Sequence, residues 1–192
     1  MSNKIIFHSQ KFKLQGIDIP EFQLEKGKLV TICIPNTDSK GRCLVHDFRY
    51  DLLHHLAENV PNAKLITDFQ ENKLISLFNA ITVENYIMKS LDIDKNKAID
   101  IAKELQIKPK EKVKNLILGQ QKALMIKCDF EKYTTLVFDY YGVGAMACEN
   151  LEQIVDAEIS KGKSGIVLDR LEYNSNEETN QNITQIKILW TQ

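Results

Sequence analysis

Three short runs rich in apolar residues limit the folds open to this chain more than any other feature. They are Leu29–Ile34, Thr134–Asp139 and Ser164–Asp169, and turn-like or helix-like sequence separates them. Consecutive apolar residues without alternation are typical of strands that are covered on both faces, and parallel sheets bury their strands in this way. The alternation of such strands with helical segments predicts an α/β protein whose parallel sheet has helices on both faces.

The remaining segments complete this pattern. Apolar spacing predicts further strands at 4–7, 17–24, 63–67 and 183–189, and helices at about 42–58, from 82 onward, and at 94–105, 118–128 and 149–160. Between Phe69 and Phe130 there is no good strand, and that interval is too long for a loop. We therefore expect a helical insertion in the α/β core of a chain whose 192 residues suit one domain.

Composition excludes several functional classes. The chain has 25 Lys+Arg and 26 Asp+Glu, and its only arginines are Arg42, Arg49 and Arg170. Near-neutral charge and scarce arginine argue against a nucleic-acid partner, because arginine is the main reader of phosphates and guanine edges. No stretch reaches the roughly 20 apolar residues of a membrane span, and the N-terminus lacks a signal-peptide core. We expect a cytoplasmic protein.

The cysteines give no sign of a metal site. They are far apart, without a C-x-x-C pair or metal-spaced histidines, which predicts reduced thiols in or near the core at Cys33, Cys43, Cys128 and Cys148.

The loop after the first buried strand gives only a hint of phosphate binding when it is taken alone. Leu29–Ile34 is followed by Pro35, Asn36 and, at position 40, a lysine. Further along, the chain carries in order FQENKLISLFNAITVENY, NLILGQQKALMIKC, TTLVFDYYG and GKSGIVLDR. Along almost its whole length it thereby resembles the nucleotide-binding domain of ATP-binding cassette (ABC) ATPases, with each motif altered.

The resemblance implies an architecture. It implies a P-loop NTPase (RecA-like) core with an N-terminal antiparallel β part and a helical subdomain at about 76–128, all within one domain spanning 1–192. The residues implied at the nucleotide are Asn36, Thr37, Ser39, Lys40, Gly41, Arg42, Gln70 and Asp139, and those implied at the signature motif are Gly119 and Gln120.

The phosphate loop has lost its glycines. When the family lysine is aligned on Lys40, Ile34, Thr37 and Ser39 stand where glycines belong, and Gly41 replaces the hydroxyl residue that would support magnesium. Glycines let such a loop adopt positive φ and bring its N–H groups close to phosphate. Weak ATP binding and a lysine–aspartate ion pair that fills the site are equally open, and a magnesium site is uncertain.

The catalytic positions are altered as well. Asp139 corresponds to the magnesium-supporting carboxylate, but Tyr140 stands where the family has its water-activating glutamate and Arg170 where it has the switch histidine. A phenol with a pKa near 10 is a poor general base at neutral pH. Ile117 and Leu118 replace a serine and a glycine of the signature. We therefore expect negligible ATP hydrolysis and assign no catalytic residue.

The resemblance implies an ABC-transporter-type subunit that couples or scaffolds a membrane transporter-like complex. Its partners would be a permease subunit, a second ABC-type ATPase subunit or a second copy of the chain, which would place the protein at the inner face of the membrane. Two alternatives are a slow ATPase completed by a partner, and a regulatory or scaffold dimer that no longer binds nucleotide.

Overall fold

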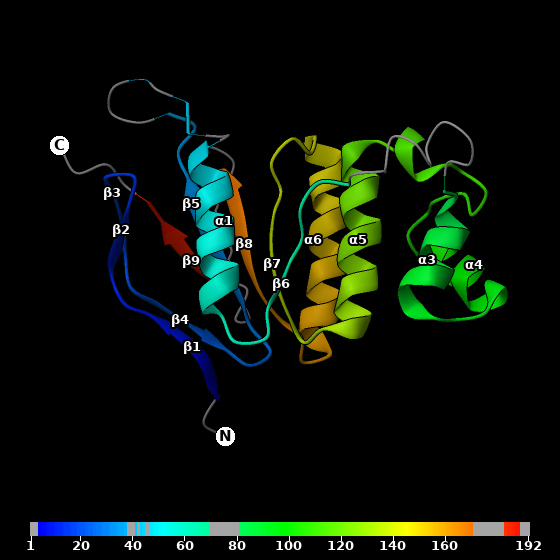
Figure 1. Cartoon of the computed structure of the whole chain (residues 1–192), viewed down its shortest axis with the longest axis horizontal. Coiled ribbons are helices and arrows are strands. Elements are labelled where there is room, and N and C mark those ends of the chain that lie inside the picture. The colour runs from blue at the N-terminus through cyan, green and yellow to red at the C-terminus, as the bar shows by residue number, and fades with distance from the viewer. Residues whose placement is uncertain are drawn as a thin grey trace. The chain divides into compact units, whose positions relative to one another are not determined.

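The structure is a computed structural model that describes residues 4–37, 41, 43–44, 47–69, 81–170 and 183–188 (Figure 1). The chain divides into two compact units. The first, here called the sheet unit, comprises Met1–Ile66, Tyr133–Tyr141 and Asp156–Gln192. The second, the helical unit, comprises Thr67–Lys132 and Gly142–Val155.

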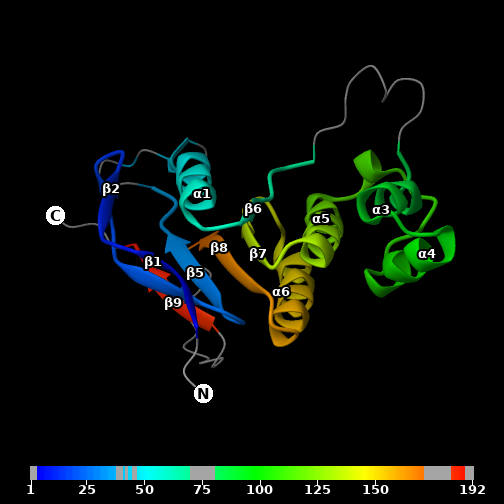
Figure 2. The ribbon, with the colours of Figure 1, turned by 60° about the horizontal axis from the view of Figure 1, so that its bottom comes forward.

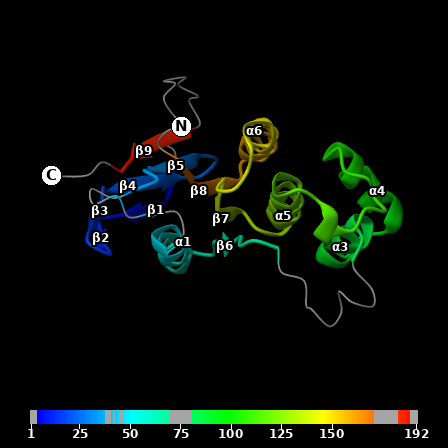
Figure 3. The ribbon, with the colours of Figure 1, turned by 90° about the horizontal axis from the view of Figure 1, so that it is seen from above.

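A five-stranded parallel sheet forms the centre of the sheet unit. Its strand order is β6-β7-β8-β5-β9, and Figure 3 shows β9, β5, β8 and β7 side by side in this order. The strands are β5 (Leu29–Ile34), β6 (Lys64–Leu65), β7 (Thr135–Asp139), β8 (Ser164–Arg170) and β9 (Ile183–Lys187). The three apolar runs that predict this sheet are its three central strands, β7, β8 and β5.

The core of the sheet unit lies between the sheet and helix α1 (Asp47–Asn59). Every residue of β5 and β7 is buried. From α1, Phe48, Leu52 and Leu56 are at most 1% exposed and pack with residues of the sheet such as Ile32 and Val137. The spacing of these helix residues, four apart, puts them on one face of the helix. The burial of this face holds α1 against the sheet in the connection between β5 and β6.

The N-terminal antiparallel part differs in one respect from the prediction. The segment 17–24 is not one strand but two, β3 (Ile17–Ile19) and β4 (Phe22–Glu25), with Pro20 between them. Proline has no N–H to donate to a sheet, so a continuous strand is interrupted there. Strand β3 pairs with β2 (Phe12–Leu14), and β4 pairs with β1 (Ile5–Ser9).

The helical unit contains α3 (Val83–Leu91), α4 (Lys95–Glu104), the 3-10 turn η1 (Val113–Asn115) and α5 (Leu118–Lys132). Helix α6 (Ala145–Ser160) begins in this unit and ends in the sheet unit. Helices α3 and α4 lie against each other, as Figure 2 shows. Thr82 and Asp94 cap the N-termini of α3 and α4 by accepting hydrogen bonds from backbone N–H groups two or three residues onward.

Three helix boundaries differ from the predictions. Helix α1 begins at Asp47 rather than near 42, because Thr37 and Cys43 form an antiparallel bridge and Leu44 N–H donates to the Asn36 carbonyl. Helix α5 continues to Lys132, and α6 begins at Ala145. The start of the predicted helical subdomain, residues 76–80, lies outside the described residues.

Candidate functional site

The carboxyl ends of three parallel strands meet at one edge of the sheet. Strand β5 ends at Ile34, β7 at Asp139 and β8 at Arg170, and in the sheet register Ile34 is paired with Arg170 and Asp139 with Leu168. In open α/β sheets, ligands bind at this edge. The edge is therefore the place to test the predicted nucleotide site.

The carboxylate of Asp139 is held by two donors at this edge. Its Oδ1 accepts a hydrogen bond from the Tyr141 backbone N–H at 2.9 Å, and Arg49 Nη1 lies 3.4 Å from the same oxygen. The Asp139 side chain is 6% exposed and that of Arg49 14%. Arg49 lies in the first turn of α1. The carboxylate that the sequence assigns to magnesium is thus paired with a guanidinium.

Tyr141 occupies the centre of the same edge. Its hydroxyl lies 3.3 Å from the carbonyl oxygen of Ile34 and 3.3 Å from that of Asp169, and it donates to these acceptors at the ends of β5 and β8. The guanidinium carbons of Arg49 and Arg170 lie 5.2 Å and 5.7 Å from the centre of its ring. Both distances fit cation–π contacts. One buried tyrosine therefore contacts the ends of two strands through its hydroxyl and two arginines through its ring.

The other two altered positions, Tyr140 and Arg170, also form contacts within the protein. Tyr140 is 4% exposed, its ring contacts Phe138 edge-on at 5.7 Å, and its backbone N–H donates to the Leu168 carbonyl. Its side chain is part of the protein interior. The Asp169 carboxylate accepts a hydrogen bond from the N–H of Arg170 at 2.7 Å. A phenol buried in this way is poorly placed to activate a water molecule.

The structure places part of the predicted phosphate loop. Asn36 and Thr37 follow β5 directly and are connected to Leu44 and Cys43 by the bridge described above, while Gly41 has a φ of 74°. A positive φ is a conformation that glycine adopts at little cost. Of the other predicted nucleotide-binding residues, Ser39, Lys40, Arg42 and Gln70 lie outside the described residues, so their role stays a prediction.

The signature-like residues Gly119 and Gln120 lie in the first turn of α5, in the helical unit. Gly119 is buried, and a Cβ at this position would lie 2.6 Å from Ala147 Cβ of α6. The glycine is therefore required by the close approach of two helices. The side chain of the neighbouring Ile117 is 63% exposed. Their contact with a nucleotide on a partner stays a prediction.

Two residues of the edge, Arg49 and Tyr141, are absent from the predicted site. The sequence carries a signal for each. Arg49 is one of only three arginines, and Tyr141 follows the strand that ends in Asp139. The motif comparison assigned a nucleotide-binding role to neither residue, which is why both are missing from the predicted site.

The cysteine prediction needs one correction. None of the four cysteines forms a disulfide, and Cys33 and Cys128 are buried as expected, but Cys43 is exposed and Cys148 is partly exposed. Cys43 lies in the loop between β5 and α1.

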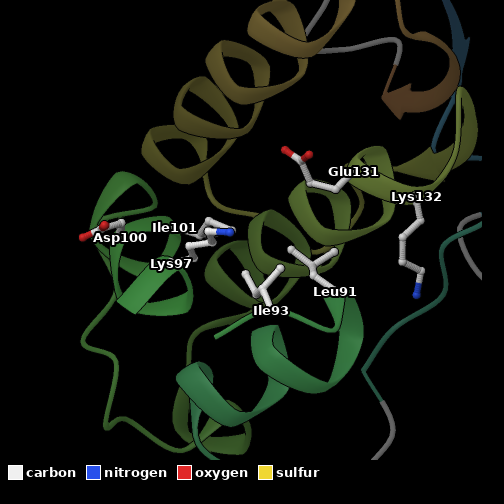
Figure 4. A pocket seen from close by; sticks show the side chains of 7 residues that line it. All are labelled: Leu91, Ile93, Lys97, Asp100, Ile101, Glu131 and Lys132. Carbon is white, nitrogen blue, oxygen red and sulfur yellow. The ribbon is translucent and has the colours of Figure 1, made fainter. Parts of the chain in front are cut away.

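A pocket of about 480 Å³ lies within the helical unit (Figure 4). Leu91, Ile93 and Ile101 give it an apolar lining, and its charged residues are Lys97, Asp100, Glu131 and Lys132. Lys97 and Asp100 form ion pairs with neighbours on α4 or at its N-cap, and Glu131 pairs with Lys127. No residue of the sheet edge belongs to this pocket.

Two features are absent from the described residues. These residues contain no group of three or more His, Cys, Asp or Glu side chains able to hold a metal ion. Among them there is also no helix both long and apolar enough to cross a membrane.

Comparisons with known proteins identify the fold. No family model matches the chain, and no curated protein matches it in sequence. Among solved structures, it is similar to a putative ABC transporter ATP-binding protein from Pyrococcus furiosus, with a TM-score of 0.61, 12% identity and coverage of 97% of this chain and 94% of the other.

Two more solved structures agree. The first is a putative metal-chelate type ABC transporter in an inward-facing conformation, with a TM-score of 0.57, 14% identity and coverage of 88% of this chain and 73% of the other. The second is a dimeric bacterial ABC transporter cassette, with a TM-score of 0.54, 13% identity and coverage of 97% and 94%. The expectation of a P-loop core with an antiparallel N-terminal part is confirmed, and this chain has the fold of the ATP-binding cassette domains of ABC transporters.

Proposed function

We propose that this chain is an ABC-transporter-type ATP-binding-cassette subunit that couples or scaffolds a membrane transporter-like complex and has negligible ATP hydrolysis of its own. In this assignment residues 1–192 form one domain, with a helical subdomain at about 76–128. Any nucleotide would bind weakly, to Asn36, Thr37, Ser39, Lys40, Gly41, Arg42, Gln70 and Asp139, and the signature-like residues would be Gly119 and Gln120.

The engagement of Asp139 by Arg49 and Tyr141 is the observation that carries the proposal. Phosphoryl transfer depends on positioning and on charges that act together around the phosphates. Here the carboxylate meant for a metal is already paired with a cation. The neighbouring Tyr140 is buried where a glutamate would be needed. Loss of one preorganised contributor costs on the order of 10²–10³ in rate, so two such losses support negligible turnover.

The neighbours' descriptions support the proposed partners. They are named as an ATP-binding protein of an ABC transporter, as a transporter and as a dimeric cassette. By analogy of fold, a permease subunit would hold this chain at the inner face of a membrane, beside a second ABC-type ATPase subunit or a second copy of itself.

A second candidate is a regulatory or scaffold dimer that no longer binds nucleotide. The arrangement of Tyr141 and Arg49 at the sheet edge favours it, because the Tyr141 hydroxyl donates to the carbonyls at the ends of β5 and β8 and Arg49 pairs with the Asp139 carboxylate. This candidate differs from the first in nucleotide affinity, which calorimetry measures directly.

Turnover and affinity test the two candidates. We expect the native chain to release phosphate from Mg-ATP no faster than its Asp139→Asn and Lys40→Ala variants, and turnover clearly above both would overturn the absence of hydrolysis. Micromolar ATP binding, about −8 kcal/mol, that is lost in Lys40→Ala would favour the coupling subunit. No binding at millimolar ATP, about −4 kcal/mol, would favour the nucleotide-free dimer.

The partner is tested in the native host. A tagged chain is purified after cross-linking in intact cells, and we expect a permease-type membrane protein to be recovered with it. A tagged chain found wholly in the soluble fraction, with only its own copies cross-linked to it, would overturn the transporter assignment and support the dimer. An unrelated soluble protein of similar size, carrying the same tag, is the control for non-specific recovery.

A further inference from the structure

The residues at the sheet edge do not fit a resident magnesium ion as they stand. A divalent cation needs several oxygen ligands with free lone pairs. Asp139 Oδ1 already accepts the Tyr141 N–H and lies 3.4 Å from Arg49 Nη1. Gly41, at the position of the family's magnesium hydroxyl, has no side-chain oxygen. A guanidinium this close to the carboxylate also repels a second cation.

We propose that the guanidinium of Arg49 is the built-in cation at the carboxyl edge of the sheet. It takes the place of the divalent metal ion that an ATP-hydrolysing ABC cassette binds. This inference rests on the proposed function in one respect: the proposed function assigns this edge of the sheet to the nucleotide site. Arg49 balances the charge of Asp139, as a metal ion would, but it is tethered to α1 and does not exchange with solvent. The site is thereby closed to divalent cations.

Burial suits arginine to this role. The Asp139 carboxylate is almost fully buried and the Arg49 side chain mostly so. Guanidinium is more weakly hydrated than ammonium and stays charged at all accessible pH values, so it is the cation that tolerates such a place. The Nε of Arg49 is buried and has no hydrogen-bond partner among the described residues. The guanidinium is therefore held by its carboxylate and by an aromatic ring.

That ring belongs to Tyr141, which acts as a positioning residue. Its face lies 5.2 Å from the Arg49 guanidinium carbon, while its N–H holds Asp139 and its hydroxyl is fixed between the strand ends. Because one residue orients both members of the ion pair, the pair has a defined geometry. An ion pair between flexible surface side chains would lack such support.

Manganese, a paramagnetic substitute for magnesium, tests the proposal. The probe is Mn²⁺ alone, added to the full-length, isotopically labelled protein, and the readout is broadening of the Tyr141 amide resonance, since this amide donates to Asp139. We expect no selective broadening in the native chain. In Arg49→Ala, broadening should appear at a Mn²⁺ concentration about tenfold lower or less, because a buried carboxylate without its partner binds a cation in compensation.

Two control variants make the result specific. Arg49→Lys keeps a cation at the edge, so its broadening should require more Mn²⁺ than that of Arg49→Ala, although a lysine fits this buried place less well than arginine. In the double variant Arg49→Ala with Asp139→Asn the ligand is removed, and the broadening should vanish. Unchanged amide resonances elsewhere in the sheet unit, such as that of the buried Leu24, show that each variant is folded.

The opposite outcomes are equally clear. Broadening of the native chain at the same Mn²⁺ concentration as Arg49→Ala would overturn the proposal. So would the absence of broadening in Arg49→Ala, or its persistence in the double variant, because Arg49 or Asp139 would then not control the cation. ATP turnover by the native chain would overturn the proposed function instead, and it is measured independently of the amide signal.

Discussion

The hydroxyl of Tyr141 lies 3.3 Å from the carbonyl oxygen of Ile34, a residue 107 positions earlier in the chain. The same hydroxyl lies 3.3 Å from the Asp169 carbonyl. Neighbouring strands of a sheet normally separate beyond their last paired residues, and their terminal carbonyls then need other donors. A side chain supplies the donor here, so the carboxyl edge of the sheet is closed by the protein itself.

Tyr141→Phe should therefore destabilise the sheet unit. The substitution removes only the hydroxyl and leaves two buried carbonyls with one donor fewer, which costs about 1 to 2 kcal/mol of unfolding free energy. Urea unfolding of the native and variant chains measures the difference. Tyr50→Phe is the matched control, because Tyr50 is exposed. Equal stability of Tyr141→Phe and Tyr50→Phe would mean that the hydroxyl adds nothing to the folded state.

Gly119→Ala should destabilise the helical unit by about 1 to 3 kcal/mol. The added methyl group would lie 2.6 Å from Ala147 Cβ and 3.3 Å from Val143 Cγ1, so helices α5 and α6 would have to move apart. Circular dichroism during thermal unfolding measures the loss. Gly144→Ala is the control, because nothing lies within 4 Å of a Cβ at Gly144.

The second substitution Ala147→Gly tests whether the stability lost in Gly119→Ala can be restored. Combined with Gly119→Ala, it removes the atom that the new methyl group meets and should restore part of the lost stability. If Gly119→Ala is as stable as Gly144→Ala, the two helices are not as close as the structure has them.

The fold could be predicted from the sequence mainly because its central strands are buried. Leu29–Ile34 reads as a strand from sequence and is one with the same boundaries, because six consecutive buried residues leave few alternatives. The caps Thr82 and Asp94 likewise mark α3 and α4 by local chemistry. The start of α1 differs from the prediction because the loop before it forms a bridge between Thr37 and Cys43, which apolar spacing does not reveal.

The candidate site was less accessible to sequence reasoning. The position of Asp139 at a strand end follows from the apolar run before it, but its partner comes from α1, 90 residues earlier. The sequence offers Lys40 as the candidate for an ion pair at this edge, whereas the pair observed among the described residues uses Arg49. Which of several cations reaches a carboxylate depends on tertiary packing, and no spacing rule specifies it.

A buried charge in the helical unit leads to a third prediction. Glu84 is 4% exposed, and its Oε1 lies 2.5 Å from Lys110 Nζ and 4.0 Å from Lys95 Nζ. The hydrogen bond with Glu84 raises the pKa of Lys110, so the stabilising contribution of the Lys110 ammonium is complete below the ordinary lysine pKa and is lost only as the pH rises above that range. Lys110→Met should lower the melting temperature of the helical unit.

The control for this prediction is Lys108→Met, which removes an exposed lysine from the same loop. Added salt should reduce the difference in melting temperature between the two variants, because the Lys110 side chain is exposed to solvent and salt screens its charge. Equal melting temperatures for the two variants at low salt would contradict a stabilising role of the Glu84 pair.

Alkaline pH should destabilise the helical unit through two groups, the buried Cys128 thiol and the partly buried Tyr86 hydroxyl. Burial, and then the nearby Asp129 carboxylate, raise the pKa of the Cys128 thiol from 9.0 to about 12. Burial, followed by the charges of Cys128 and Asp129, raises the pKa of Tyr86 from 10.0 to about 12. In the unfolded chain both groups ionise at their ordinary values. Between pH 9 and 12 the folded state therefore holds protons that the unfolded state has lost, and stability falls as the pH rises.

Urea unfolding at increasing pH measures this loss. The stabilising contribution is complete below pH 9, and above it the slope for Cys128 should approach about 1.4 kcal/mol per pH unit, the value for one proton. Cys128→Ala should remove the part of the slope that begins near pH 9, and Tyr86→Phe the part that begins near pH 10. The comparison uses slopes, because the cavity left by Cys128→Ala lowers stability at every pH. Parallel curves for the native chain and both variants would show that neither proton is retained on folding.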